Sequence, residues 1–329
     1  MIKKVRIRNF KSIKDLEFKP AKINIFIGEP NTGKSNILEA IGSFSLPYAE
    51  LGGIDGVFRS NDLSDLFFDD NVEEDVTIDA DDKHIVIHYD TNSLNYVLKA
   101  YSRDLGDFIS CTQEIKRGRV SSLSWNDNAM KVNIKLYRFK TLTEYPERKQ
   151  IGFLKPIYGE NLPSLLRTHK SLRDLVKSMF DAFGYRLMLK PETNNIEIVK
   201  VKEDMILSLP YTVVSDTLRR HLFHMLAIKS NKDSVLLFEE PEAHAFPRHI
   251  KTLAETIAMD KTNQFFIATH NPYLLRSIME KAPKGSLNIY ATYMKDYQTR
   301  LKLLDRKTME EIFVKDLDPF FNLERFLEE

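Results

Sequence analysis

The sequence contains a single cysteine, Cys111, among its 329 residues. This excludes a disulfide framework and zinc sites built from several cysteines, and it favours a reducing compartment. Glycine and proline are few, at 12 and 13 residues, so a collagen-like or low-complexity chain is excluded. No apolar run approaches the roughly 20 residues that a membrane-spanning helix needs, and the charged N-terminus has no signal-peptide core. The sequence therefore predicts a cytoplasmic globular protein that does not interact with membranes.

Neither sign of charge is in excess, since 48 basic residues face 47 acidic ones for a net charge of +1. A uniformly basic, non-specific DNA-binding protein is thus excluded. Three local basic clusters remain, at Lys3–Lys14, Lys116–Arg119 and Lys131–Lys140, and they are either nucleic-acid contacts or the polar sides of exposed strands. The last two combine into the best candidate DNA surface. Ten carboxylates without a Lys or Arg among them lie between Asp62 and Asp82, which predicts a solvated loop, with a metal site as the alternative.

Apolar periodicity predicts an α/β fold. Taken in order, it indicates three strands within 1–27, a helix from Ser35, antiparallel strands over 76–140, helices over 161–183, a helix from Ser215, and short buried strands at 235–238 and 265–269. The apolar run before Gly28 is dense enough for a central buried strand. No internal repeat or sustained heptad pattern is present, which excludes a long coiled coil.

The segment Gly28–Ser35 reads GEPNTGKS and matches the phosphate-binding pattern G-x-x-x-x-G-K-[ST] in full. Its glycines let backbone N–H groups surround phosphate oxygens, and the helix that follows directs its positive end at them. Lys34 is expected to reach the β- and γ-phosphates, and the Ser35 hydroxyl to bind Mg²⁺. The candidate nucleotide-binding residues of this segment are Gly28, Asn31, Thr32, Gly33, Lys34, Ser35 and Asn36.

Two further polar motifs each follow a short apolar strand. Glu239 and Glu240 come directly after VLLF, where the first could hold Mg²⁺ through water and the second could orient or deprotonate a water molecule. His270 follows FFIAT and could contact the γ-phosphate or that water. Alone, a carboxylate pair can cap a helix and a histidine can be structural. Their order behind a phosphate loop favours the nucleotide site.

These motifs resemble a known family. VRIRNFKSIKDLEF before the phosphate loop, LLFEEPEAHAFP and FIATHNPYLL are similar to the RecF/SMC-like branch of ATP-binding-cassette (ABC) ATPases, above all to the ATPase domain of OLD-type (overcoming-lysogenisation-defect) proteins and their stand-alone relatives. The resemblance implies a P-loop NTPase fold of ABC-ATPase type with a mixed sheet. It also implies an antiparallel first lobe at 1–150, a helical insertion at 151–200 and a second lobe at 201–329.

The resemblance also implies roles for individual residues. Glu239 corresponds to the Walker B acid and Glu240 to the catalytic base, while Glu242–His244 matches the D-loop and His270 the switch histidine. Ser215 corresponds to the signature serine, which in this family meets the γ-phosphate held by a second subunit. The implied assembly is therefore a homodimer joined through sandwiched ATP.

The sequence departs from the family at three points. The Walker B acid is usually Asp and here is Glu239, whose carboxylate lies further out. In VVSDTLRRHLF, Asp216 and Thr217 replace small residues of the signature motif, and the carboxylate adds negative charge near phosphate. The Q-loop is ambiguous between Gln150 and Asn161.

The resemblance implies ATP and Mg²⁺ as cofactors and ATP hydrolysis that drives dimerisation, in DNA repair or anti-phage defence. DNA and a separate nuclease or effector protein are candidate partners, because the stretch after His270 is too short for the TOPRIM nuclease domain of OLD proteins. The alternative is an ATP-locked scaffold with incidental hydrolysis. A small-molecule kinase is disfavoured, since kinases rarely need the EEPEAH and ATHNP motifs.

Overall fold

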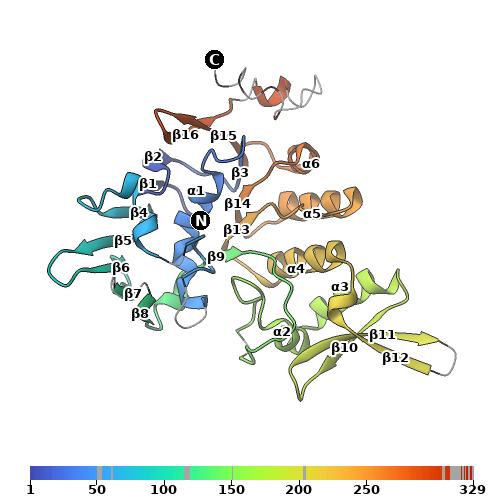
Figure 1. Ribbon diagram of the computed structural model, residues 1–329. Coiled ribbons are helices and arrows are strands. Elements are labelled where there is room, and N and C mark those ends of the chain that lie inside the picture. Colours follow the sequence, from blue (N-terminus) through green and yellow to red (C-terminus); the bar gives the residue numbers. More distant parts are fainter. Residues whose placement is uncertain are drawn as a thin grey trace.

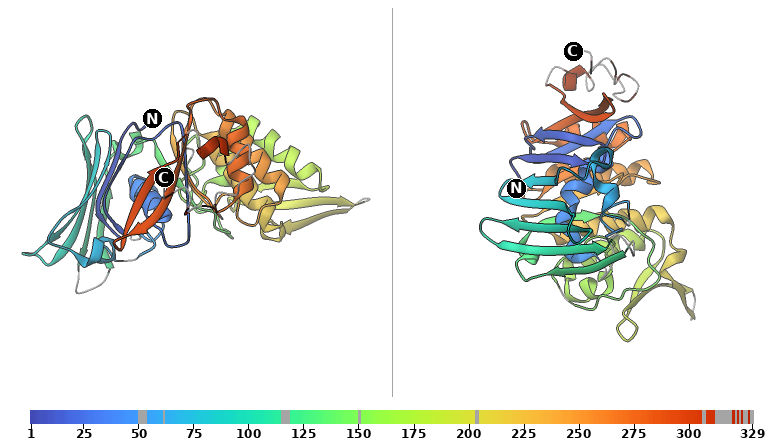
Figure 2. Two further views of the ribbon diagram at one scale, coloured as in Figure 1. Left: turned by 90° about the horizontal axis from the view of Figure 1, so that it is seen from above. Right: turned by 60° about the vertical axis from the view of Figure 1, so that its left-hand side comes forward.

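The computed structural model describes the chain except for residues 50–53, 61, 115–118, 150, 203–204, 306–307, 312–319, 321, 323, 325–326 and 328–329. Its strands form sheets of seven, six and three strands. The two larger sheets lie side by side with a helix between them (Figure 1). The three-stranded sheet projects away from both, as the view from above in Figure 2 shows. No helix in the described part of the chain is long and apolar enough to span a membrane.

The six-stranded sheet carries the site. Its order is β16-β15-β3-β14-β13-β9, and all neighbours are parallel except the pair β15–β16. The strands are β3 (Ile23–Gly28), β9 (Ile134–Tyr137), β13 (Val235–Glu239), β14 (Gln264–Ala268), β15 (Leu287–Lys295) and β16 (Gln298–Leu303). Parallel strands covered on both faces need apolar residues throughout, which explains the short apolar runs of β3, β13 and β14. The carboxyl ends of these strands meet at one edge, so the loops that follow them lie together.

Four helices cover this sheet. One face carries α1, and the other carries a layer of three helices that Figure 1 shows in parallel. They are α1 (Lys34–Gly42), α4 (Asp216–Ser230), α5 (Pro247–Met259) and α6 (Pro272–Lys281). Ile37, Leu38 and Ile41 of α1 are fully buried in a core shared with the seven-stranded sheet. Each contributes roughly 1.5–3 kcal/mol of apolar burial, which fixes the helix beneath the phosphate loop.

The seven-stranded sheet has the order β2-β1-β4-β5-β6-β7-β8 and is antiparallel throughout. Its strands are β1 (Val5–Phe10), β2 (Ile13–Phe18), β4 (Val76–Ala80), β5 (Lys83–Asp90), β6 (Asn95–Ser102), β7 (Gly106–Glu114) and β8 (Arg119–Trp125). Buried and exposed residues alternate along β4 and β6, as expected for strands with one face on the core. The prediction of an antiparallel sheet in this region is confirmed.

The middle of the chain is only partly helical. Its elements are α2 (Leu162–Thr168), α3 (Lys170–Asp181), β10 (Arg186–Lys190), β11 (Asn195–Lys202) and β12 (Met205–Pro210). The two helices match the predicted segment 161–183, whereas the three strands were not expected from the sequence. The division into two lobes and an insertion stays a prediction. Short 3₁₀ helices complete the fold at Ser43–Tyr48 (η1), Ser64–Leu66 (η2), Phe68–Asp70 (η3), Ala129–Lys131 (η5) and Tyr211–Val213 (η6).

The prediction for residues 131–140 is wrong. This stretch was expected to belong to an antiparallel sheet, with its basic residues either on the exposed side of a strand or in contact with DNA. Instead, β9 pairs in parallel with β13 inside the six-stranded sheet. Lys135 is only 3% exposed, and its ammonium donates to Asn231 Oδ1 at 2.6 Å. The rest of the proposed DNA surface is not placed, because Lys116 and Arg117 lie outside the described residues.

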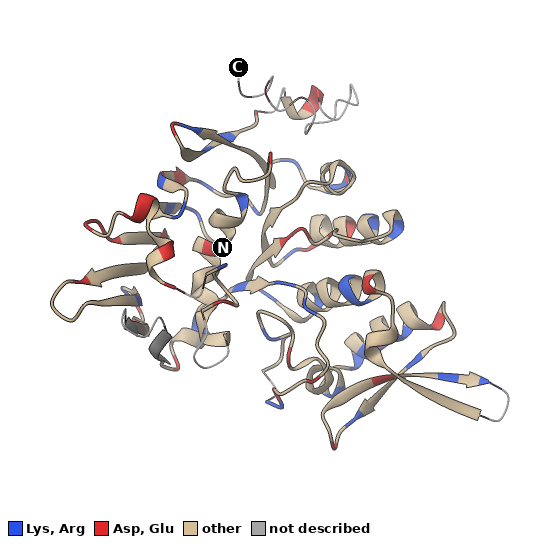
Figure 3. Ribbon diagram, in the orientation of Figure 1, with Lys and Arg blue, Asp and Glu red and all other residues tan. Residues whose placement is uncertain are grey.

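The acidic stretch between Asp62 and Asp82 forms the short helices η2 and η3 and the strand β4 where it is described. Figure 3 shows these carboxylates as red segments at the left, around β4 and β5. Asp81 accepts the backbone N–H groups of Lys3 and Lys4 at 2.9 and 2.8 Å. No group of three or more metal-ligating side chains occurs among the residues that the structure describes.

Gly33 is one of two positions, with Gly28, where the phosphate loop leaves no room for a side chain. Its backbone is in the left-handed region, with φ at 93°. A β-carbon there would lie 2.1 Å from Thr299 Oγ1 of β16. Thr299 cannot retreat easily, because its N–H donates to the carbonyl of Ser12 at 2.7 Å. The loop is therefore packed against β16 as closely as a glycine allows.

Replacing Gly33 with alanine should lower the free energy of unfolding by more than about 2 kcal/mol, since a left-handed strain of roughly 1 kcal/mol adds to an overpacking cost of about 1–3 kcal/mol. Gly285→Ala is the matched control, because φ is also positive there (78°) and its β-carbon would meet no atom within 4 Å. Chemical denaturation measures both. Equal losses in the two variants would show that the contact with Thr299 costs nothing.

Candidate nucleotide-binding site

The phosphate loop joins β3 to α1 and is fixed from the side by β15. Thr32 Oγ1 donates to the carbonyl of Glu29 at 2.8 Å and lies 2.7 Å from Thr292 Oγ1. Asn31 has a positive φ of 62°, so the chain curls back at this point. By helix geometry, the amides of the first turn of α1 have no acceptor within the helix. They are available for an anion at its N-terminus.

Lys34 lies across this loop. Its ammonium donates to the carbonyl oxygens of Gly28 and Glu29, at 2.9 and 2.7 Å. Burial lowers the pKa of Lys34 to about 8, against the opposing effect of the nearby carboxylates Glu240 and Glu29. The lysine is thus a poorly solvated cation whose present partners are neutral carbonyls. An anionic phosphate would be a stronger partner.

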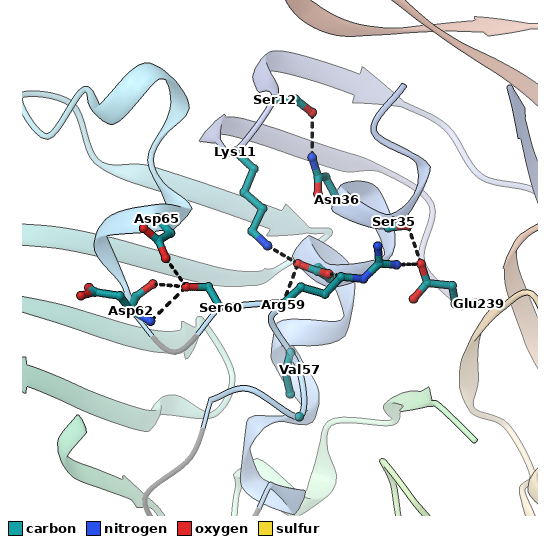
Figure 4. Close-up of polar contacts among 12 residues, drawn as sticks. Lys11, Ser12, Ser35, Asn36, Val57, Arg59, Ser60, Asp62, Asp65 and Glu239 are labelled. Carbon is teal, nitrogen blue, oxygen red and sulfur yellow. Dashed lines mark hydrogen bonds and ion pairs between the residues drawn. The ribbon is translucent and has the colours of Figure 1, made fainter. Parts of the chain in front are cut away.

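Ser35 and Glu239 meet below the loop, from α1 and from the end of β13. The Ser35 hydroxyl donates to Glu239 Oε1 (Figure 4). A hydroxyl and a carboxylate are the hard oxygen ligands that Mg²⁺ prefers alongside phosphate and water, so the donor set fits this ion. Asn36, by contrast, directs its amide to Ser12 Oγ at 2.7 Å, in the turn between β1 and β2.

Glu240 and His270 follow adjacent strands, β13 and β14. The Glu240 backbone has a positive φ of 43°, and its N–H donates to the carbonyl of Ala268 at 2.9 Å. Its carboxylate oxygen Oε1 lies 3.8 Å from His270 Nε2, and the Glu240 side chain is half exposed. Burial and the nearby Lys34 charge lower the pKa of His270, so the ring is neutral at pH 7. The pair can hold one water between them.

The D-loop segment links this edge to helix α4. Glu242 is buried, and burial raises its pKa to about 7. The Thr269 hydroxyl donates to Glu242 Oε1, which connects the segment to the end of β14. Thr217 Oγ1 in the first turn of α4 donates to the carbonyl of His244 at 2.6 Å. The segment Glu242–His244 is therefore bonded both to the start of α4 and to the end of β14.

Ser215 caps α4, since its hydroxyl accepts the N–H of Leu218 at 3.4 Å. Among the described residues, no hydrogen bond or ion pair joins Ser215 to the phosphate loop of the same chain. The Asp216 carboxylate lies 2.6 Å from Arg220 Nε and 3.4 Å from Arg219 Nη2. Its negative charge, which the sequence placed near phosphate, is thus balanced within the helix.

A family model described as "AAA domain, putative AbiEii toxin, Type IV TA system" matches residues 23–276, a span that includes the phosphate loop, both glutamates and His270. The chain belongs to this AAA family. A search of curated proteins found no match.

Solved structures of SMC heads are similar to this AAA-family chain. An SMC head bound to the C-terminal winged-helix domain of ScpA covers 94% of this chain and 99% of its own, with 18% identity and a TM-score of 0.52. A Pyrococcus furiosus SMC head bound to the C-terminal domain of ScpA has 16% identity, coverage of 96% and 98%, and a TM-score of 0.47. A Thermotoga maritima SMC head has 15% identity, coverage of 92% and 99%, and a TM-score of 0.43. The fold is that of a P-loop NTPase of ABC-ATPase type, as predicted.

Of the two Q-loop candidates of this AAA-family chain, Gln150 lies outside the described residues. Asn161 is only 1% exposed, and its side chain accepts the N–H of Lys155 at 2.7 Å and donates to the carbonyl of Phe153 at 2.8 Å. Its amide therefore holds a loop together.

The structure also places Arg138, Arg59 and Glu39 beside Glu239 and Ser35, which the sequence analysis missed. Arg138 had a local sequence signal, because it directly follows the short strand IKLY, as Glu239 follows VLLF. Arg59 and Glu39 belong to no motif, and only the folded chain reveals their position.

Binding of ATP to this AAA-family chain should weaken as the pH rises above about 8, because the Lys34 pKa is about 8 before binding and phosphate charge raises it afterwards. The decline approaches about tenfold per pH unit. Calorimetric titrations from about pH 7 to about pH 9.5 measure it. Lys34→Ala should bind at least about tenfold more weakly at neutral pH and lose most of this dependence. A pH-independent affinity of the unaltered protein would contradict the assignment.

Proposed function

We propose that this AAA-family chain binds and hydrolyses ATP with Mg²⁺, and that ATP joins two copies of the chain. The observation that carries the proposal is the Ser35–Glu239 contact directly below the phosphate loop, with Lys34 across that loop. A lone loop of this pattern could be an ordinary turn. A hydroxyl and a carboxylate from different elements that meet beneath it are what a Mg²⁺–phosphate group requires.

The remaining residues have distinct duties in hydrolysis. Bound Mg²⁺ neutralises phosphate charge and orients the phosphate oxygens. Glu240 and His270 hold a water molecule between them, and Glu240 accepts its proton as the water oxygen bonds to the γ-phosphorus and the bond to the β-phosphate oxygen breaks. The neutral ring of His270 contributes a hydrogen bond to this water, while Glu240 remains the group that accepts the proton.

Two observations support the dimer. The hydroxyl of Ser215, at the positive end of α4, makes no recorded bond to the phosphate loop of its own chain within the described residues. Val213 and Phe246 lie next to Ser215 and the D-loop in the sequence, and they are 56% and 65% exposed. Removing apolar side chains of this size from water is energetically favourable. A second copy, with its phosphate loop facing Ser215, would cover this surface.

The biological setting that we propose is DNA repair or anti-phage defence, with a nuclease or effector protein as partner. The description of the matched family names the AbiEii toxin of a type IV toxin–antitoxin system. The motifs of the chain also resemble those of OLD-type ATPases. The SMC head with a TM-score of 0.52 was solved with a bound domain of ScpA, and this supports a second protein as a partner of this chain. Hydrolysis measured with and without DNA tests the nucleic-acid part.

Glu240→Gln should still bind ATP and Mg²⁺ but hydrolyse ATP at least about a hundredfold more slowly, because an amide cannot accept the proton. The variant should then accumulate as an ATP-bound dimer, which light scattering detects as a doubled mass. Glu240→Gln combined with Lys34→Ala is the control and should stay monomeric in ATP.

An unchanged mass of Glu240→Gln in ATP and Mg²⁺, with ATP binding shown separately, would rule out the sandwich dimer. Hydrolysis at the unaltered rate would remove Glu240 from its role as the base. Either result would favour the alternative, a scaffold that ATP locks.

A further inference from the structure

Glu39 is a buried carboxylate that gathers three cations below the phosphate loop. It lies on α1 and is completely buried. Its oxygens lie 2.5 Å from Lys11 Nζ, 3.3 Å from Arg59 Nε and 3.2 Å from Arg138 Nη2. A buried carboxylate persists only when such partners compensate its desolvation. Glu39 therefore collects positive side chains from three separate segments at one point, and two of them, Arg59 and Arg138, also pair with Glu239. Figure 4 shows Lys11 and Arg59 on the same side of Glu239.

Arg138 is held rigidly at this point. It comes one residue after β9, whose Tyr137 pairs with Phe238 of β13, so it stands level with Glu239. Nη1 donates to the carbonyls of Gly56 and Val57 at 3.1 and 2.9 Å, and Nη2 donates to Glu39. The remaining group, Nε, makes no hydrogen bond to a described residue and forms an ion pair with Glu239 Oε2 at 3.5 Å. The side chain is only 15% exposed.

Arg59 contacts the other oxygen of the same carboxylate but is far more exposed than Arg138. Its Nη2 pairs with Glu239 Oε1, the oxygen that also accepts the Ser35 hydroxyl. The Arg59 side chain is 55% exposed, and it comes from the loop whose carbonyls Arg138 binds. Water and salt reach this guanidinium and partly screen its charge, whereas the Glu239 side chain is only 15% exposed. The guanidinium thus pairs with the same Glu239 oxygen that Ser35 contacts, the oxygen that a Mg²⁺ ion would need.

We infer that the two arginines divide the control of the Walker B carboxylate between them, an inference that rests on the proposed function. Arg138 is a positioning residue that keeps Oε2 in place, so that Oε1 stays directed at Ser35. Arg59 is a placeholder that neutralises Oε1 until Mg²⁺ arrives with ATP and displaces it. Loss of the placeholder removes a competitor of the metal. Loss of the positioning residue frees Glu239 to turn both oxygens toward Arg59.

The inference also accounts for the glutamate at this position. Glu239 has one more rotatable bond than the aspartate usual in this branch, so its carboxylate can occupy more positions. A fixed guanidinium on Oε2 removes that freedom before any ligand binds. A carboxylate preorganised in this way does not have to be ordered when the ion arrives.

The test measures ATP affinity by calorimetry at a series of Mg²⁺ concentrations and takes the half-saturating Mg²⁺ as the readout. Arg59→Gln should lower this value, by about threefold because the Arg59 side chain is exposed. Arg138→Gln should raise it by about tenfold, the effect of one charge-assisted contact. Arg138→Lys keeps the charge but cannot span Glu39, two carbonyls and Glu239, so it should also raise the value. Arg186→Gln, on exposed β10, is the control.

Opposite shifts in the Arg59 and Arg138 variants support the inference, and shifts of the same sign overturn it. A purely structural role of Arg138 would lower the melting temperature and weaken ATP binding equally with Mg²⁺ and with EDTA, which would also overturn it. Absence of ATP binding by the unaltered protein would instead refute the proposed function and this inference with it. ATP binding without opposite shifts refutes the inference alone.

Discussion

Parallel pairing of β3, β14 and β13 is the constraint on which the candidate site depends. In this register Ala268 stands opposite both Phe26 and Glu239, so the three strands end within a residue or two of each other. The phosphate loop, the carboxylate pair and His270 then leave the sheet at one edge. Slipping any strand by one residue would turn its side chains to the opposite face and exchange the two cores. The apolar burial of the strands thus also sets the geometry of the polar edge.

The hydrophobic cores on the two faces of the six-stranded sheet hold different parts of the site. Between the sheets, the buried face of α1 anchors the helix that carries Lys34 and Ser35. On the far side, α4 to α6 hold the carboxylate and histidine strands. Glu39 is the exception, a charge inside the first core. Removing only its partners would leave an uncompensated buried carboxylate, which ties the stability of α1 to the same arginines that contact Glu239.

The central elements of this fold could be predicted because their signals are local. The phosphate loop has a fixed spacing, and β13 and β14 are short apolar runs followed by polar residues. Other features depend on partners distant in the chain. The sequence of β9 is typical of an exposed strand, because Lys135 lies within it and Arg138 directly follows it. In the folded chain, Lys135 donates a hydrogen bond to Asn231 and Arg138 donates one to Glu39, so both charges have partners in the interior. The strands β10 to β12 went unnoticed, because β12 is exposed along its whole length and lacks a buried face.

The contact of Thr292 and Thr299 with the phosphate loop has a consequence for biosynthesis. The loop is complete by residue 35, but the residues that hold it in shape from the side lie more than 250 positions later, in β15 and β16. Contacts this distant in sequence form late and slowly, and an emerging chain folds from its N-terminal end. The nascent protein therefore carries an unsupported phosphate loop until β15 and β16 leave the ribosome. A chain cut short before these two strands would lack the contacts that hold the loop in shape.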